Sequence, residues 1–221
     1  MNILITGGEA SGKSAYAEQI AVEKAAKENL PLFYIATLDR NCGGDTENRI
    51  KKHEKMREGK GFLTIEKPKD LDKLALSKEN AVVLIEDLAN LCANELFCAP
   101  TTPVAVDRHD TNTNYASHGK IRTSALSAAT LSASVPIFAD GVARKIVNEL
   151  SSVAKKARDV IVVSPDVFSD APTTTKADGT TEPFSADMHI FLQTLASAAN
   201  IWAEKCESVV QVVAGIPVAI K

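Results

Sequence analysis

A glycine-rich turn between an apolar strand and a helical pattern, close to the N-terminus, constrains this chain more than any other feature. The apolar run Asn2–Thr6 predicts a buried strand, and the residues from Gly7 to Ser14 fit Gly-x-x-x-x-Gly-Lys-Ser. That pattern is typical of a phosphate-binding loop when a strand precedes it and a helix follows. The loop's backbone N–H groups and the start of the helix bind phosphate oxygens. We therefore expect a nucleotide site here.

The loop side chains have separate expected roles. Lys13, a catalytic residue, is expected to contact the β- and γ-phosphates, and the hydroxyl of Ser14 to bind Mg²⁺. The residues expected to bind nucleotide phosphates are Gly7, Gly8, Glu9, Ala10, Ser11, Gly12, Lys13 and Ser14. The metal also needs a carboxylate at the end of a neighbouring strand. Glu86 and Asp87 close the apolar run Val82–Ile85, and we assign the role to Glu86 because it directly ends the strand. A solvated acid at an ordinary strand end is the alternative.

Short apolar runs alternate with longer helical patterns, which is typical of βαβ units around a parallel sheet. Several runs are almost wholly apolar, as in strands covered on both faces. We expect strands at Asn2–Thr6, Leu32–Ala36, Ala81–Glu86, Asp159–Ser164 and Ser208–Val213, and edge strands at Phe62–Ile65 and Pro217–Ile220. We expect helices at Lys13–Asn29, Thr46–Arg57, Leu88–Phe97, Gly141–Lys156 and Ala186–Cys206. The predicted fold class is α/β, a P-loop NTPase-type three-layer fold with a mostly parallel central sheet and helices on both faces.

The 221 residues suit one full-sized α/β domain, so we expect a single P-loop nucleotide-binding domain over residues 1–221. Irregular segments are expected near 100–135 and 165–183. The first shows apolar periodicity only at Ile121–Leu131, which predicts a loop followed by a short helix. The second contains three prolines and a threonine run, and loops of this length are commonly mobile lids or disordered segments.

Composition excludes several classes of function. A net charge of −3 without a basic cluster argues against nucleic-acid binding. The apolar run near the C-terminus is interrupted by polar, glycine and proline residues and is too short for stable membrane insertion. Because the start of the chain also lacks the pattern of a signal peptide, a cytoplasmic protein is expected. The four cysteines have neither zinc-site nor disulfide-framework spacing, so we expect buried free thiols.

Three residues spaced four apart, Arg49, His53 and Arg57, fall on one face of the predicted Thr46–Arg57 helix. Two guanidinium groups beside an imidazole can bind a polyphosphate. A neutral imidazole can also attack phosphorus and form a phosphoramidate. An ordinary solvated helix face remains the alternative on spacing alone.

These stretches together resemble the bifunctional adenosylcobinamide kinase / adenosylcobinamide-phosphate guanylyltransferase family of cobalamin biosynthesis. The resemblance is carried by Ile5–Ser14, Tyr34–Thr37, Asn48–Ile50 with His53 and Arg57, Val83–Glu86 with Asn94 and Leu96–Phe97, and Val213–Lys221. It implies that a nucleoside triphosphate phosphorylates adenosylcobinamide, and that a histidine then takes GMP from GTP and passes it to that phosphate. The substrates implied are GTP or ATP and a corrinoid, with Mg²⁺, and the subunits of the family form homo-oligomeric trimers.

The resemblance also assigns roles to residues. His53 matches the guanylylated, catalytic histidine of the family. The further nucleotide contacts implied are Ala36, Thr37, Leu38, Glu54, Arg57, Glu66 and Glu86. Residues 1–97 and the last dozen residues carry most of the match.

The sequence departs from the family after the strand Asp159–Ser164, where the family has Asn-Glu-Val-Gly. Asp166 can replace that glutamate, but Phe168 lacks the backbone freedom of a glycine. Glu58 stands where the family has a proline. Two alternatives therefore stay open: a kinase-only homologue, and a GTP-binding protein without turnover. A generic small-molecule kinase is disfavoured because residues 165–183 contain no arginine to clamp the transferring phosphoryl group.

Overall fold

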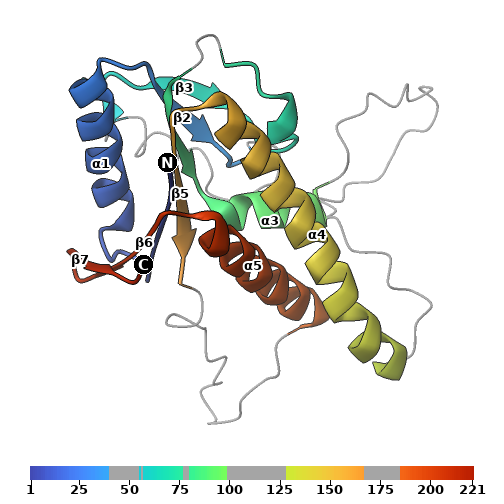
Figure 1. Ribbon diagram of the computed structural model, residues 1–221. Helices are drawn as coiled ribbons and strands as arrows, with labels where there is room; N and C mark the ends of the chain where they lie inside the picture. The colour runs from blue at the N-terminus through green and yellow to red at the C-terminus, as the bar shows by residue number, and fades with distance from the viewer. Residues whose placement is uncertain (40–54, 56, 77–79, 99–127, 167–184) are drawn as a thin grey trace, which may run out of the picture.

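The computed structural model describes residues 1–39, 55, 57–76, 80–98, 128–166 and 185–221, and a seven-stranded sheet runs through its centre (Figure 1). The strand order across the sheet is β3-β2-β4-β5-β1-β6-β7. The strands are β1 (Asn2–Gly7), β2 (Leu32–Ala36), β3 (Leu63–Glu66), β4 (Val82–Glu86), β5 (Asp159–Pro165), β6 (Ser208–Val213) and β7 (Ile216–Ala219). All pairings are parallel except that of β6 with β7. The sheet is mostly parallel, as predicted.

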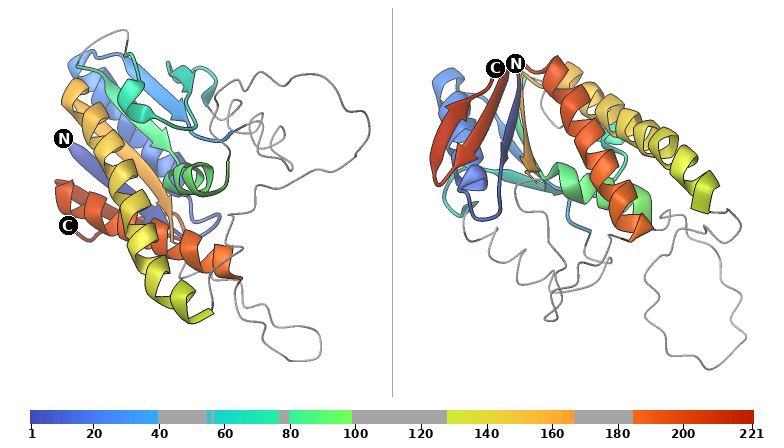
Figure 2. Two further views of the ribbon diagram at one scale, coloured as in Figure 1. Left: turned by 90° about the vertical axis from the view of Figure 1, so that its right-hand side faces the viewer. Right: turned by 90° about the horizontal axis from the view of Figure 1, so that it is seen from below.

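Helices cover both faces of this sheet (Figure 2). One face carries α1 (Lys13–Glu28), and the other carries α3 (Leu88–Phe97), α4 (Ala128–Lys156) and α5 (Ala186–Lys205). The predicted three-layer α/β class is confirmed.

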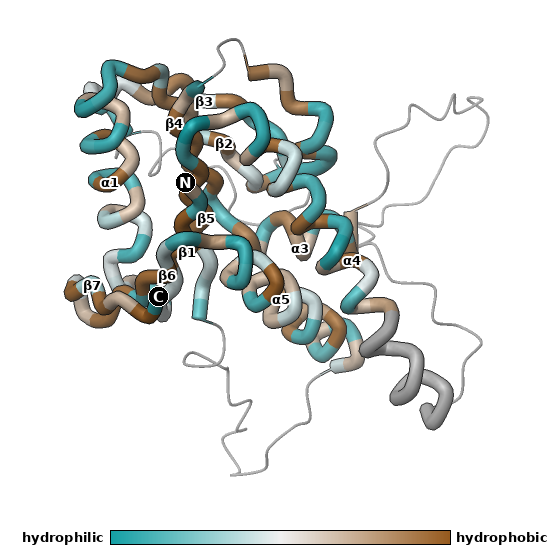
Figure 3. Tube along the Cα trace, in the orientation of Figure 1, coloured by the Kyte–Doolittle hydropathy of each residue, from teal (hydrophilic) through white to brown (hydrophobic). Residues whose placement is uncertain are grey.

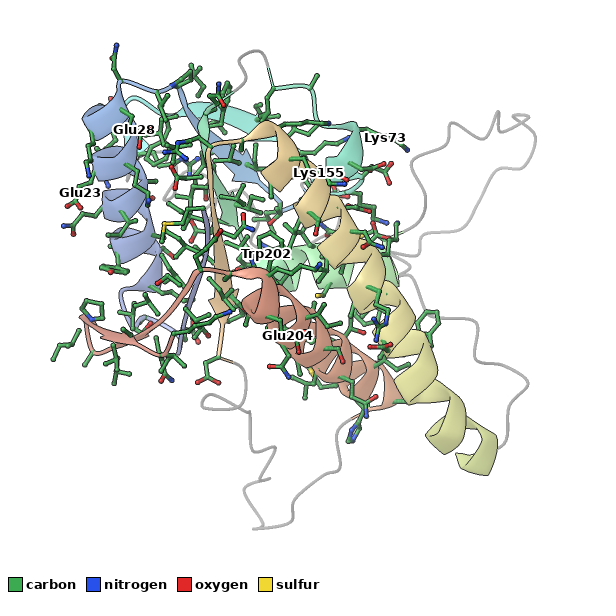
Figure 4. The ribbon with its side chains drawn as sticks, in the orientation of Figure 1. Glu23, Glu28, Lys73, Lys155, Trp202 and Glu204 are labelled. Carbon is green, nitrogen blue, oxygen red and sulfur yellow. The ribbon has the colours of Figure 1, made fainter. Side chains whose placement is uncertain are left out.

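The alternation of side chains along β4 shows why two helical layers are needed. Val83 and Ile85 pack with α3, α4 and α5, whereas Val82 and Leu84 pack with α1. The central strands are correspondingly apolar in Figure 3. Trp202, fully buried on α5, is directed into the interior, while Glu204 is exposed (Figure 4). Because both faces of such a strand are apolar, its sequence does not show which side chains face which helical layer.

The helix boundaries follow the capping residues of the sequence. Asn29 ends α1 in the left-handed conformation, φ 53°, as its position before Pro31 predicted. The carboxylate of Asp87 accepts a hydrogen bond from the backbone N–H of Asn90 at 2.8 Å and begins α3. The hydroxyl of Ser185 accepts one from the N–H of Met188 at 3.2 Å and begins α5.

The structure differs from the sequence analysis at three points. The helix α4 begins at Ala128 rather than Gly141, so its first turns lie inside the segment expected to be irregular; Pro136 and the Ser- and Thr-rich composition weaken the helical pattern there. A 3₁₀ turn at Leu71–Lys73 was not predicted. Cys92 and Cys206 are buried free thiols, as expected, but Cys98 is disulfide-bonded, which the cysteine spacing did not indicate.

Some predictions lie outside the described residues. They are the irregular segments over 99–127 and 167–184, and most of the predicted Thr46–Arg57 helix. Within the described parts of the chain, no helix has both the length and the apolar character needed to cross a membrane.

Candidate nucleotide site

The phosphate-binding loop connects the end of β1 to the start of α1, as the sequence predicted. A Cβ on Gly7 would lie 2.5 Å from the carbonyl oxygen of Val212 and 2.6 Å from Oγ of Ser11, so no larger residue fits without movement. Gly12 has φ 91°, in the left-handed region that glycine adopts without strain. Glycine is therefore required at position 7 because a larger side chain would clash, and at position 12 because the backbone is left-handed.

Backbone contacts from neighbouring strands brace this loop. The N–H of Gly215, in the turn between β6 and β7, donates to the carbonyl of Ser11 at 2.8 Å, and the N–H of Asp166 donates to that of Gly7 at 2.9 Å. Nζ of Lys13 donates to the carbonyl of Gly8 at 3.0 Å, which places the ammonium group over the loop. The hydroxyl of Ser11 is buried and has no hydrogen-bond partner in the described part of the chain. The loop thus holds a cation and an unpaired buried hydroxyl where phosphate oxygens are expected.

Three of the predicted nucleotide contacts are side by side in the sheet. Ala36, at the end of β2, pairs with Glu66 of β3 on one side and with Glu86 of β4 on the other. Their strands are parallel, so all three residues lie at the same edge of the sheet as the phosphate-binding loop. The predicted contacts therefore share one edge although they are distant in sequence.

Glu86 was expected at the end of a strand next to β1, which leads into the phosphate-binding loop. Its strand, β4, is not next to β1. β5 lies between β4 and β1 and pairs with both. Parallel strands are about 4.8 Å apart, so the two strand ends are separated by roughly 10 Å. Side chains and a bound metal ion can span that separation. The sequence did not show that β5 lies between β4 and β1, because β5 comes much later in the chain than either strand.

Glu86 itself is buried, with an exposed fraction of 7%. Strand alternation places it on the α1 face with Leu84. One carboxylate oxygen, Oε2, accepts a hydrogen bond of 2.9 Å from the hydroxyl of Tyr34. The alternative of a solvated acid at a strand end is therefore wrong for Glu86.

The turn after β2 is held by a hydrogen-bonded network. Thr37 is fully buried, and its hydroxyl accepts from the N–H of Asp87 at 2.7 Å. Its backbone N–H donates to the carbonyl of Glu86 at 3.2 Å. The side-chain amide of Asn94 donates to the carbonyls of Thr37 and Pro68, at 2.7 and 2.9 Å. These contacts fix Thr37, and with it the adjoining Leu38, relative to the ends of β3 and β4.

Arg57 is the described member of the predicted basic face. It is 7% exposed, and its guanidinium carbon lies 3.5 Å from the ring centroid of Tyr34. Nε and Nη1 are buried and have no hydrogen-bond partner within the described residues. The solvated-face alternative is therefore wrong for Arg57. Arg49, His53 and Glu54 lie outside the described residues.

A cavity of about 480 Å³ adjoins Arg57. Its lining consists of Lys55, Arg57, Glu58, Gly59, Gly61, Phe62 and Thr64. Two of these side chains are cationic, one is anionic and one is aromatic, so the lining carries a net positive charge beside an aromatic ring.

A phosphate-binding loop after the first strand of a mostly parallel sheet, with a buried carboxylate at the same edge and a buried guanidinium over β2, defines an α/β nucleotide-binding protein of the P-loop class. Within that class, the chain belongs to the family described as cobinamide kinase / cobinamide phosphate guanyltransferase, whose model matches residues 3–220. The protein is accordingly a kinase and guanylyltransferase, an enzyme that transfers phosphorus-containing groups.

The other comparisons are more distant. No curated protein matches the chain. Among solved structures, one ATPase domain is 10% identical with a TM-score of 0.40, and the match covers 95% of this chain and 68% of that one. The flagellar accessory protein FlaH from Methanocaldococcus jannaschii is 13% identical with a TM-score of 0.38, covering 100% and 77%.

Sequence reasoning missed several residues that shape the site. Tyr34 and Asn94 belong to the family motifs, but nothing in their spacing indicated contacts with Arg57, Glu86 or Thr37. Glu18 of α1 is fully buried and accepts a hydrogen bond from Nζ of Lys60. The only signal for Glu18 was its place four residues after Ser14, on the same helix face.

The close approach at Gly7 predicts a stability defect for Gly7→Ala. The added Cβ meets the backbone carbonyl of Val212, which cannot turn aside as the Ser11 side chain can, so we expect the free energy of unfolding to fall by about 1–3 kcal/mol. Gly141→Ala is the matched control, because a Cβ at this helical residue meets open space; it should stabilise the protein by up to about 1 kcal/mol. Urea unfolding measures both, and equal midpoints for Gly7→Ala and wild type would contradict the predicted clash.

Proposed function

We propose that this protein phosphorylates adenosylcobinamide and then transfers GMP from GTP to the cobinamide phosphate through a guanylylated His53. The observation that carries the proposal is the contact of Tyr34 with both Arg57 and Glu86, of which Glu86 ends β4 at the sheet edge that bears the phosphate-binding loop. A buried guanidinium with unused N–H donors suits a polyphosphate, and membership of the family supplies the reaction.

In the kinase step, the loop N–H groups and Lys13 bind the triphosphate. The substrate hydroxyl attacks the γ-phosphorus, loses its proton, and the bond to the β-phosphate oxygen breaks to release a nucleoside diphosphate. The hydroxyl of Ser14 and the carboxylate of Glu86 suit Mg²⁺, which prefers oxygen ligands and neutralises phosphate charge when bound. Lys13 and the loop orient the triphosphate for this attack.

In the second step, a neutral imidazole nitrogen of His53 attacks the α-phosphorus of GTP. The bond to the β-phosphate oxygen breaks and pyrophosphate leaves, so GMP is held through a P–N bond. Arg49 and Arg57 stabilise the negative charge that develops on the leaving pyrophosphate. A phosphate oxygen of cobinamide phosphate then attacks the same phosphorus, which releases His53 and gives GDP-cobinamide.

The remaining residues of the site contact the nucleotide in this proposal. They are Gly7, Gly8, Glu9, Ala10, Ser11 and Gly12 around the phosphates, and Ala36, Thr37, Leu38, Glu54 and Glu66 around the rest of GTP. The register of Ala36, Glu66 and Glu86, together with the hydrogen bonds that fix Thr37, supports a shared role.

Membership of the family favours both activities over the two alternatives that the departures at Glu58 and after Ser164 raised, a kinase-only enzyme and a GTP-binding protein without turnover. Incubation with adenosylcobinamide, GTP and Mg²⁺, followed by mass spectrometry of the corrinoid, separates all three. The proposal predicts a phosphate adduct that is converted to the GDP derivative. Accumulation of the phosphate alone would leave a kinase, and unchanged corrinoid would contradict both activities.

We further propose that residues 1–221 form one domain and that the protein is located in the cytoplasm. We also propose that it assembles as a homo-oligomer, specifically a trimer. The antiparallel edge strand β7 supports assembly, because edge strands are prone to pairing with another chain. Its neighbourhood exposes Val213, Ile216, Val218 and Ile220, and the strand is apolar in Figure 3. Light scattering should give three times the mass of the chain, and a monomer at micromolar concentration would contradict the assembly.

A further inference from the structure

One buried side chain contacts both charged groups that the proposed reactions use. Tyr34 is the third residue of β2 and is 3% exposed. Its hydroxyl donates to Oε2 of Glu86 at 2.9 Å, while its ring lies under the guanidinium of Arg57 at 3.5 Å. The ring also contacts Phe62 edge to face, with 6.0 Å between centroids. Tyr34 is therefore held from both sides and cannot move independently of Arg57 or Glu86.

The ring holds Arg57 without using its N–H groups. A guanidinium stacked on an aromatic face is attracted by the ring quadrupole, so its donors at the edge stay available. Nε and Nη1 indeed have no hydrogen-bond partner in the described chain. An ion pair with a carboxylate would fix Arg57 as well, but it would occupy those donors. The stack thus positions the cation and preserves its capacity to bind an anion.

The hydroxyl holds Glu86 by a hydrogen bond between two buried side chains. It donates to Oε2 of the carboxylate at 2.9 Å. The bond lies along a cross-strand diagonal, since Tyr34 pairs with Leu84 and Glu86 is two residues further along β4. The orientation of the carboxylate is therefore set by the strand register.

A second contact holds the segment that carries Arg57. Lys60, three residues after Arg57, forms an ion pair with Glu18, which is fully buried on α1. Because α1 starts directly after the phosphate-binding loop, this pair docks the segment on the helix of the loop. Arg57 is thereby placed by α1 on one side and by β2 on the other.

We propose that Tyr34 is a positioning residue that holds Glu86 through its hydroxyl and Arg57 through its ring, and so couples the metal-binding side of the site to the side that stabilises the leaving pyrophosphate. This inference rests on the proposed function. The hydroxyl positions Glu86 and the ring positions Arg57, so substitutions that remove one or both parts of the side chain separate the two roles.

The first variant, Tyr34→Phe, removes the hydroxyl and keeps the ring. We expect the Mg²⁺ concentration for half-maximal rate to rise about 10-fold in both the kinase step and GMP-adduct formation, because Glu86 loses a donor. At saturating Mg²⁺, the rate of adduct formation should stay close to that of wild type. Tyr16→Phe is the matched control, since Tyr16 is a half-buried tyrosine on α1 whose hydroxyl has no hydrogen bond in the described structure; it should leave both reactions unchanged.

The second variant, Tyr34→Leu, removes the ring as well. We expect the same Mg²⁺ shift and, at saturating Mg²⁺, adduct formation slowed by about a further 10-fold, with the kinase step slowed no more than in Tyr34→Phe. A merely structural role would lower both reactions together in Tyr34→Leu. That result in a folded variant would overturn the assignment of the ring.

A double-mutant cycle tests the hydroxyl even if Tyr34→Leu does not fold. If the hydroxyl acts through Glu86, Tyr34→Phe combined with Glu86→Gln should be no slower than Glu86→Gln alone. Independent, multiplying effects would overturn the proposal, as would an unchanged Mg²⁺ dependence in Tyr34→Phe. Failure of the proposed function is distinguishable, because wild type would then form no GMP adduct at all.

Discussion

Replacing Lys13 with alanine is expected to lower both reactions, phosphoryl transfer to cobinamide and formation of the GMP adduct, by more than about 100-fold. Loss of one positioned electrostatic group from such a site reduces the rate by roughly 10²–10³. The ammonium group of Lys13 lies over the loop, 3.0 Å from the carbonyl of Gly8. Because one loop serves both reactions, the two rates should fall together.

Steady-state rates for Lys13→Ala measure this prediction, with thermal unfolding as the check on folding. Lys27→Ala is the matched control, because Lys27 is an exposed lysine in the last turn of the same helix. Both rates of the control should equal those of wild type. A folded Lys13→Ala variant that keeps either reaction within about 3-fold of wild type would contradict a shared triphosphate site.

Much of the fold could be predicted because its signals are local. The buried strands are continuous apolar runs, and the glycines of the loop and Asn29 mark where α1 begins and ends. The loop from Gly7 to Ser14 is also a local pattern, so its position between β1 and α1 followed directly from the sequence. The placement of Ala36, Glu66 and Glu86 at one sheet edge follows from their positions at the ends of parallel strands.

The remainder depends on contacts between distant segments. The position of β5 between β4 and β1 is a matter of strand order, which apolar runs do not encode. Arg57 is buried against the ring of Tyr34, which belongs to β2. The spacing of Arg57 along a predicted helix could not show this contact, because the same spacing equally suits a solvated face. The pair between Lys60 and Glu18 joins residues 42 positions apart. Periodicity describes one element at a time, so it cannot reveal such pairs.

Replacing His53 with alanine should abolish the GMP adduct and leave the kinase step near its wild-type rate. The imidazole is the only group that forms the P–N bond in the proposed mechanism, whereas phosphoryl transfer to the hydroxyl does not involve it. His189→Ala is the matched control, since His189 is exposed near the start of α5. The control should form the adduct at the rate of wild type.

The most direct test of the account is intact-protein mass spectrometry after incubation with GTP and Mg²⁺, on wild type, His53→Ala and His189→Ala. We expect one added GMP on wild type and on His189→Ala, lost in acid as a P–N bond should be, and none on His53→Ala. Wild-type protein that is folded and binds GTP but gains no GMP would contradict transfer through a covalent histidine, as would an adduct that persists in His53→Ala.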